Sequence, residues 1–183
     1  MTEDFVAVVE AKRFLGREFL TWLVHMIEEG GGRIERDGDL IELQLGDRVV
    51  LAGVGPDKPR LTVAGTGDMR AEIGAGLRRG KLLDQAKIAI VRGGGERRWE
   101  LSLDGGMLTY DSLRCPQLGD KDKGAEDDPR AAFENDLFLR IADMEDAVDV
   151  LDRLYAEFCR LRGSSAWATR TLPALRTWVQ TLR

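Results

Sequence analysis

Three consecutive glycines, Gly30–Gly32, divide the first part of this 183-residue chain into two segments with different hydrophobic periods. Before them, residues 14–29 place apolar side chains at helical spacing, at Leu15, Phe19, Trp22, Leu23, Met26 and Ile27. The glycines end this expected helix, because glycine readily adopts the left-handed conformation found after a helix. After them, residues 33–64 alternate between apolar and polar, which is typical of half-buried strands. The chain must therefore combine helix and sheet, and the pattern leaves open whether residues 5–13 extend the helix or form a short strand.

Residues 33–64 predict about four short strands in an antiparallel meander. Two dipeptides in this segment have the composition of hairpin turns, Asp37-Gly38 and Gly46-Asp47. The last two strands are expected at residues 48–54 and 60–63, joined by a glycine- and proline-bearing loop at residues 55–59.

A second group of elements follows the meander. A short helix is expected near residues 68–79, and three strands at residues 86–91, 97–103 and 107–110, with Gly93–Gly95 as the turn between the first two. The pattern does not decide whether these strands form a second sheet or continue the first.

Two helices are expected after the charged loop at residues 116–130. The first runs from about 131 to 161, with a predicted buried stripe of Leu137, Phe138, Ile141, Met144, Val148, Leu151, Tyr155, Phe158 and Leu161. The second contains Trp167, Leu172, Leu175, Trp178 and Leu182. Thr171 is a candidate cap for it, because Pro173 then falls in its first turn.

These elements predict an α+β fold, in which antiparallel strands (a meander and a second set of three) are enclosed by an N-terminal helix and long C-terminal helices. The length suits one domain over residues 1–183, with a possible subdivision into 1–66 and 67–183. No apolar run approaches the roughly 20 residues of a membrane helix, and the acidic N-terminus does not resemble a secretory signal. Two remote cysteines, Cys115 and Cys159, suit a cytoplasmic protein.

Residue types that usually carry catalysis are few. The single histidine, His25, lies within an apolar helical pattern and cannot form a zinc site with two remote cysteines. Two Asp-x-Asp spacings, Asp37 with Asp39 and Asp120 with Asp122, are the remaining basis for an enzyme that uses carboxylates or a divalent metal. Both fall in turn or loop sequence, where aspartate is expected for its local hydrogen bonds. The sequence therefore predicts a non-enzymatic protein with no cofactor and no metal.

The glycine-rich residues 65–81 do not match a phosphate-binding loop. That loop requires four residues between its first glycine and a Gly-Lys pair, followed by serine or threonine, whereas here Ala75 breaks the spacing and Leu82 follows Lys81. Nucleotide binding is not expected.

Charge is unevenly distributed along a chain whose net charge is −5. Residues 116–157 carry thirteen acids against five bases, whereas residues 70–98 carry eight bases against three acids, and residues 160–183 carry five arginines and no acid. The middle segment predicts a basic face able to contact phosphates, the alternative being solvated charges or ion pairs with the acidic helix. The candidate contacts are Arg78, Arg79, Lys81, Arg97 and Arg98. Trp99 is the one candidate in this segment for stacking on a base.

Several stretches resemble a known family. The segment FLGREFLTWL at residues 14–23 is similar to one in bacterial proteins grouped with the recombination-associated protein RdgC. Residues 75–90, AGLRRGKLLDQAKIAI, resemble the later half of that family in layout, as do WELSL at 99–103 and LTYDSL at 108–113. The expected long helix to Leu161 also fits. The resemblance covers about two-thirds of the chain.

The resemblance implies a non-enzymatic protein that binds double-stranded DNA without strong sequence preference, forms a homodimer and is linked to recombination. The chain is shorter than full-length members and is acidic, and no DNA-contacting position is transferred from the family. The alternative is a protein-interaction or dimerisation module that shares the fold without binding DNA. Its surface would be the acidic helix and the last helix, with Trp167 and Trp178 exposed, whereas the other interpretation is that both tryptophans are core residues.

Overall fold

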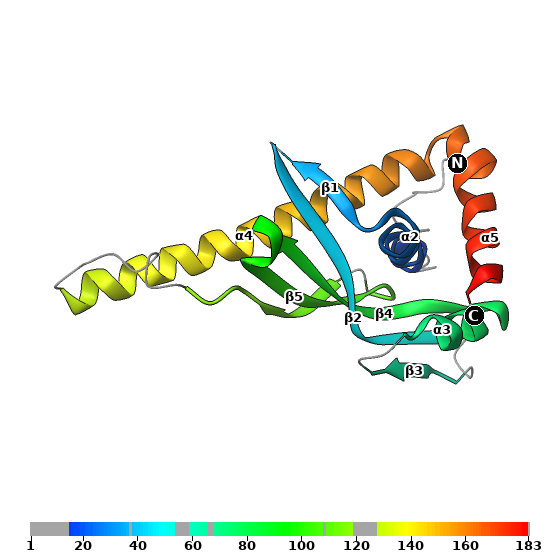
Figure 1. Ribbon diagram of the computed structural model, residues 1–183, viewed down its shortest axis with the longest axis horizontal. Helices are drawn as coiled ribbons and strands as arrows, with labels where there is room; N and C mark the ends of the chain where they lie inside the picture. Colours follow the sequence, from blue (N-terminus) through cyan, green and yellow to red (C-terminus); the bar gives the residue numbers. More distant parts are fainter. Residues whose placement is uncertain are drawn as a thin grey trace, which may run out of the picture.

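The computed structural model describes residues 15–36, 38–53, 59–65, 68–107, 109–118 and 128–182. Within these residues one antiparallel sheet forms the centre of the fold, in the order β1-β2-β4-β5-β6, with β3 also paired to β2 (Figure 1). The strands are β1 Arg33–Arg36, β2 Asp39–Gly53, β3 Leu61–Ala64, β4 Lys81–Arg92, β5 Arg97–Asp104 and β6 Thr109–Arg114. The helices are α2 Leu15–Gly30, α3 Arg70–Arg78, α4 Pro129–Arg162 and α5 Leu172–Thr181. The predicted α+β class is confirmed, and the second set of strands continues the first sheet.

One face of the sheet carries α2 and the second half of α4. The two helices bury their apolar side chains against the inward residues of β2, β4 and β5, so that a single core includes Leu23, Ile88, Trp99, Leu101 and Leu154. Phe158 is fully buried where these helices meet. Its ring lies 5.5 Å from that of Phe19, 5.8 Å from Trp22 and 5.6 Å from Trp167, measured between centroids.

Local turn chemistry explains where α2 and β1 end. Gly31 and Gly32 have φ of 67° and 62°, which confirms the predicted glycine stop after α2. Arg36 pairs with Asp39 in the β1–β2 register, and Gly38 has φ of 86°. The hairpin predicted at this point is confirmed.

The turn predicted at Gly46-Asp47 is wrong. β2 continues through it as one strand, with a register shift against β4 between Leu45 and Val49. A Cβ on Gly46 would lie 3.0 Å from the Lys87 carbonyl oxygen, so this glycine permits a close approach of two strands. Two other strands differ in extent: β4 begins five residues before the prediction, and β6 lies at 109–114 because Met107 donates its N–H to Asp104 Oδ1 within the preceding turn. The expectations for residues 5–13 and for most of the loops at 55–59 and 116–130 lie outside the described residues.

The buried stripe predicted for α4 is correct only in its second half. Leu151 and Phe158 are buried, whereas Leu137, Phe138, Ile141 and Met144 are exposed by 48%, 69%, 42% and 48%. The reason is visible in Figure 1, in which the first half of α4 extends past the end of the sheet. Periodicity identified an apolar face that the described residues do not cover.

The last helix also differs from the prediction in its start. Thr171 is not a cap, because a π-helical turn at Trp167–Thr171 leads directly into α5, with Thr171 itself in a helical conformation. Trp167 and Trp178 are buried, with 7% and 3% exposure, so both belong to the core and do not form the exposed surface of the interaction-module alternative. No described helix has the length and apolar composition needed to cross a membrane.

Two glycines of the glycine-rich segment serve helix packing. A Cβ on Gly74 would lie 2.5 Å from Leu182 Cβ and 2.9 Å from its carbonyl oxygen, and one on Gly76 would lie 2.9 Å from Leu51 Cδ2. The missing side chains let α3 pack closely on the end of α5 and on β2.

We expect Gly74→Ala to lower the free energy of unfolding by roughly 1–2 kcal/mol, because overpacking at the α3–α5 contact outweighs the gain in helix propensity. Gly163→Ala is the matched control, since its Cβ would lie 3.5 Å from the nearest atom at an ordinary φ of −80°. Urea unfolding of both variants measures the difference. Equal stability of the two variants would contradict the close packing.

Candidate functional site

The five predicted DNA-contacting residues occupy two separate places. Arg78 and Arg79 end α3 and Lys81 begins β4, whereas Arg97 and Arg98 begin β5, opposite Arg92 and Val91 at the far end of β4. Eleven steps along β4 separate these ends, which corresponds to roughly 36 Å. The structure therefore separates the five residues into a group of three, at the start of β4, and a group of two, at the start of β5.

In the group of three, two side chains hold neighbouring segments. Arg78 Nη1 donates to the carbonyl oxygens of Val179 and Leu182, at 3.0 and 2.8 Å, and so fastens the end of α5 to α3. Lys81 Nζ donates to the carbonyl oxygen of Pro59. Arg79 is exposed. Of these three, Arg79 is the side chain best placed to contact a partner.

In the group of two, both guanidinium groups have acidic partners. Arg98 pairs with Glu100 at 3.0 Å and donates to Gln44 Oε1 at 2.8 Å. The hydrogen bond from Arg98, with Lys87 nearby, lowers the pKa of Glu100. Arg97 pairs with Asp143 of α4. Binding a phosphate here would have to compete with these carboxylates.

Trp99 lies at the centre of this second group and is buried, with 1% exposure. Its Nε1 donates to the Asp143 carbonyl oxygen at 2.8 Å, and the guanidinium carbons of Arg92 and Arg97 lie 5.8 and 5.1 Å from its ring. Arg92 in turn pairs with Asp146 at 3.0 Å. This cluster joins the sheet to α4 and leaves no free ring face for a base, so the stacking role considered for Trp99 is wrong.

A groove of about 390 Å³ between α2, α3 and α5 gathers basic side chains that the prediction did not combine. Arg17, Arg78 and Arg176 line it, with Glu18 as its acidic residue. Glu18 is paired with Arg162 at 2.8 Å, and Arg176 is exposed. For Arg176, the signal in the sequence was the run of arginines without acids at residues 160–183. The groove combines an apolar floor with a basic rim.

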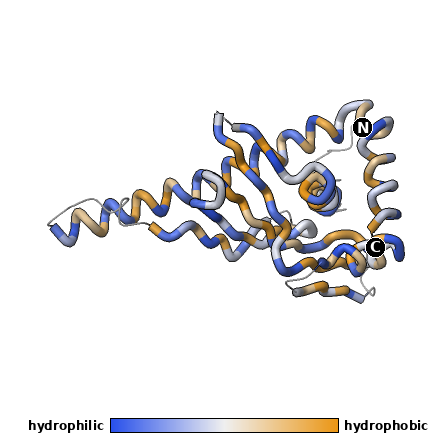
Figure 2. Tube along the Cα trace, in the orientation of Figure 1, coloured by the Kyte–Doolittle hydropathy of each residue, from blue (hydrophilic) through white to orange (hydrophobic). Residues whose placement is uncertain are grey.

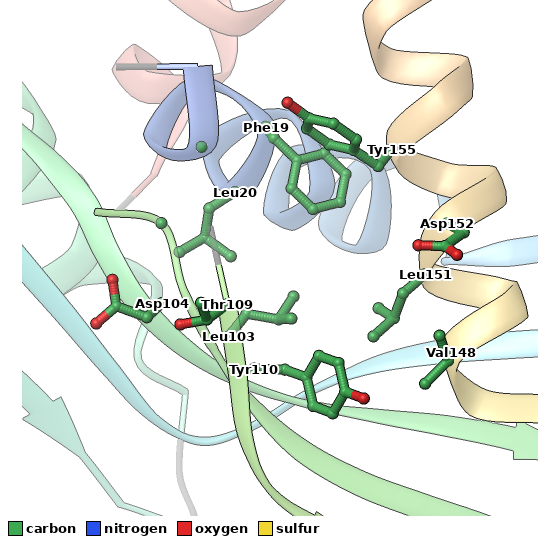
Figure 3. A pocket seen from close by; sticks show the side chains of 12 residues that line it. Phe19, Leu20, Leu103, Asp104, Thr109, Tyr110, Val148, Leu151, Asp152 and Tyr155 are labelled. Carbon is green, nitrogen blue, oxygen red and sulfur yellow. The ribbon is translucent and has the colours of Figure 1, made fainter. Parts of the chain in front are cut away.

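A second cavity, of about 220 Å³, is mostly apolar (Figure 3). Leu20, Leu103, Tyr110 and Leu151 point into it from α2, the strands and α4, with Asp104 at one side. Burial disfavours the charged form of Asp104, but hydrogen bonds from Gln85 and from the Met107 and Gly106 amides outweigh it and lower the pKa. A general acid at neutral pH needs the opposite shift.

Tyr155 lines the same cavity from α4. Burial, together with the neighbouring Cys159 thiol, raises the pKa of Tyr155 to about 12. Its hydroxyl is therefore neutral at physiological pH. The cavity suits a small apolar group better than proton-transfer chemistry.

The structure describes only some of the residues that were considered for catalysis and metal binding, and it indicates neither role for them. His25 is half-buried, with its ring edge-on to Trp178 at 5.3 Å, and burial lowers its pKa. The described residues contain no cluster of three potential metal ligands. Asp37, Asp120 and Asp122 lie outside the described residues, so the structure does not test the two Asp-x-Asp spacings.

The FLGREFLTWL segment at residues 14–23 contacts β4. Arg17, from this segment, donates Nε to Asp84 Oδ1 at 2.8 Å, and Asp84 belongs to β4. Arg60 also reaches Asp84, at 3.1 Å, and the carboxylate is 2% exposed. A Cβ on Gly105 would lie 3.1 Å from the Gly16 carbonyl oxygen. The α2 helix is therefore held against β4 and against the turn that follows β5.

Comparison with models of known protein families and with curated proteins found no match to this chain.

Proposed function

We propose that this chain is a non-enzymatic, cytoplasmic DNA-associated protein of the RdgC-like type. It binds double-stranded DNA without strong sequence preference, forms a homodimer and is linked to recombination. The observation that supports DNA association best is the basic rim of the groove between α2, α3 and α5, where Arg78 and Arg176 lie on facing helices. Arg79 follows Arg78 at the same end of the molecule.

The physical basis of this proposal is the phosphate backbone. Arginine side chains on neighbouring helices can each contact a phosphate oxygen, and such contacts carry affinity but no sequence information. Because Arg78 and Lys81 also hold tertiary structure, the exposed residues Arg79 and Arg176 are the ones whose charge is available without loss of an internal contact among the described residues. The number of contacts is small, so binding should be weak and sensitive to salt.

The test is a titration of labelled duplex DNA, followed by fluorescence anisotropy, with Arg79→Glu/Arg176→Glu. We expect at least ~10-fold weaker binding at low salt and a salt slope smaller in magnitude by about 2, because two phosphate contacts are lost. The loss should be the same for unrelated DNA sequences.

Arg98→Gln provides the control for this experiment. It removes one positive charge from the basic segment at the opposite end of β4, where Arg98 is paired with Glu100. We expect it to bind DNA as the parent does. Absence of DNA binding by the parent chain at low salt would refute the proposed function, and equal losses in both variants would refute the assignment to this groove.

A second candidate, a protein-interaction or dimerisation module, is favoured by a different observation. The first half of α4 exposes a row of large apolar side chains, which soluble monomers rarely do. A chain that binds no DNA but self-associates or captures a protein through this row would support the second candidate.

A further inference from the structure

The projecting part of α4, residues 129–146, is here called the arm. Its exposed apolar side chains are Phe133, Leu137, Phe138, Ile141 and Met144. Spacings of three and four residues place most of them on one side of the helix. Figure 2 shows hydrophobic and hydrophilic stretches alternating along this projecting helix. A groove of about 690 Å³, lined by Pro116 and by Leu139, Ala142 and Asp143, lies on another side of the helix. The apolar row is therefore not the side of the arm that faces its own chain.

When two copies of the arm are paired antiparallel, the charged residues beside this row meet residues of opposite charge on the other copy. Arg130 and Glu145 lie near the two ends of the arm, and their midpoint is between residues 137 and 138. Asp136 and Arg140 have their midpoint at residue 138. If two arms pair antiparallel about Phe138, Arg130 of each comes near Glu145 of the other, and Arg140 near Asp136. In a parallel pair, Arg130 would face Arg130 and Arg140 would face Arg140, which is unfavourable.

The contacts that these charged groups make within their own chain leave them able to contact a second arm. Arg130 pairs with Glu134 at 3.0 Å within its own helix, with the two side chains 85% and 53% exposed, and such a pair contributes little. Arg140 donates one N–H to the Pro116 carbonyl oxygen at 2.8 Å and retains its other donors. Glu145 is exposed.

We propose that the arm is a dimerisation surface, on which the α4 arms of two copies of this chain pair antiparallel about a two-fold axis at Phe138. The apolar rows interdigitate as in other antiparallel helix pairs, and the four symmetry-related charge contacts fix the direction and the register. This proposal specifies the interface of the homodimer in the proposed function. The pairing of the arms does not depend on DNA binding.

The first test is sedimentation of the purified chain without DNA, at concentrations up to ~100 µM, a range suited to a small interface. We expect a dimer whose dissociation constant increases at least ~100-fold in Phe138→Glu, because each dimer buries this side chain twice. Phe138 is 69% exposed, so the variant should fold, and circular dichroism checks this. A strictly monomeric parent, or a dimer that Phe138→Glu leaves intact, would overturn the proposal.

Charge exchange tests the register. Arg130→Glu and Glu145→Arg are each expected to weaken the dimer roughly 10-fold, and the double variant to return within about 3-fold of the parent. The loss of the Arg130–Glu134 pair cannot account for rescue by a change at residue 145. Failure of the rescue would overturn the proposed register.

Cross-linking tests the direction of the pair. In a Cys115→Ser/Cys159→Ser background, Phe138→Cys is expected to form a disulfide-linked dimer under mild oxidation. Arg130→Cys is the matched control: in the antiparallel pair its two copies lie about 24 Å apart along the helices, beyond the reach of a disulfide. Cross-linking at both positions would indicate a parallel pair and overturn the proposal. DNA titration is independent of these three assays, so failure of either proposal can be recognised separately.

Discussion

Replacement of Arg17 by methionine is expected to lower the free energy of unfolding by about 3–5 kcal/mol, because it leaves a buried carboxylate without its main partner. Asp84 lies in β4 with 2% of its side chain exposed, and Arg17 holds it through Nε at 2.8 Å and Nη2 at 2.7 Å. Methionine retains most of the volume of the arginine stem, so the cost arises from the uncompensated charge. Urea unfolding at neutral pH measures the loss.

Arg60→Met is the matched control, because Arg60 contacts the same carboxylate at 3.1 Å. Its side chain is 67% exposed, so we expect a loss below about 1 kcal/mol. The double variant Arg17→Met/Asp84→Leu should recover part of the stability, since no buried charge then remains unpaired. If Arg17→Met and Arg60→Met have the same small effect, Asp84 is not the buried anchor that the structure indicates.

Most helices and strands could be predicted because each is determined by local pattern. The α2 helix followed from its apolar spacing and the glycines after it, and the β1–β2 hairpin from Asp37-Gly38. Gly46-Asp47 has a similar composition and yet lies inside β2. The difference is the backbone of Lys87 next to Gly46, which belongs to a strand about 40 residues later and which no local pattern includes.

The α4 helix shows a second limit of prediction from hydrophobic periodicity. Its apolar residues continue with helical spacing over the whole length, and this periodicity predicts a helix correctly. It carries no information on whether another element covers the face. The sheet reaches only the end of the arm near Asp143 and Asp146 and contacts another side of the helix, so the same pattern that buries Phe158 leaves Phe138 exposed.

The candidate site was predictable only at the level of charge. Counting bases identified residues 70–98 as a positive segment. The structure shows that several of these basic side chains already bind groups of the same chain. Arg97 pairs with an acid 46 positions away, and Arg78 donates to carbonyl oxygens 101 and 104 positions away. Such partners depend on the fold. Arg79 and Arg176 become the better candidates only once α3 and α5 are seen to lie together.

The two proposed surfaces lie at opposite ends of the molecule. The arm begins far from α3 and α5, which meet at the other end (Figure 1). Variants at the two ends share no contacts, so their effects should add and each surface can be removed without the other. A dimer joined through the arms would hold one basic groove at each of its far ends. Long duplexes could then bridge the two grooves, whereas short ones could occupy only one.

Phe158→Ala is expected to lower the free energy of unfolding by about 3–5 kcal/mol, because it leaves a cavity where α2, α4 and the final helical segment meet. Phe158 is completely buried, and its ring contacts those of Phe19, Trp22 and Trp167. These aromatic contacts add to the loss beyond the buried area. Phe138→Ala, on the same helix, provides the same chemical change at a side chain 69% exposed, and should cost less than about 0.5 kcal/mol at protein concentrations low enough to dissociate the proposed dimer. The contrast is measured by urea unfolding with tryptophan fluorescence as the probe. Similar losses in both variants would mean that the arm is covered in the monomer, and would contradict both its exposure and its proposed role in dimerisation.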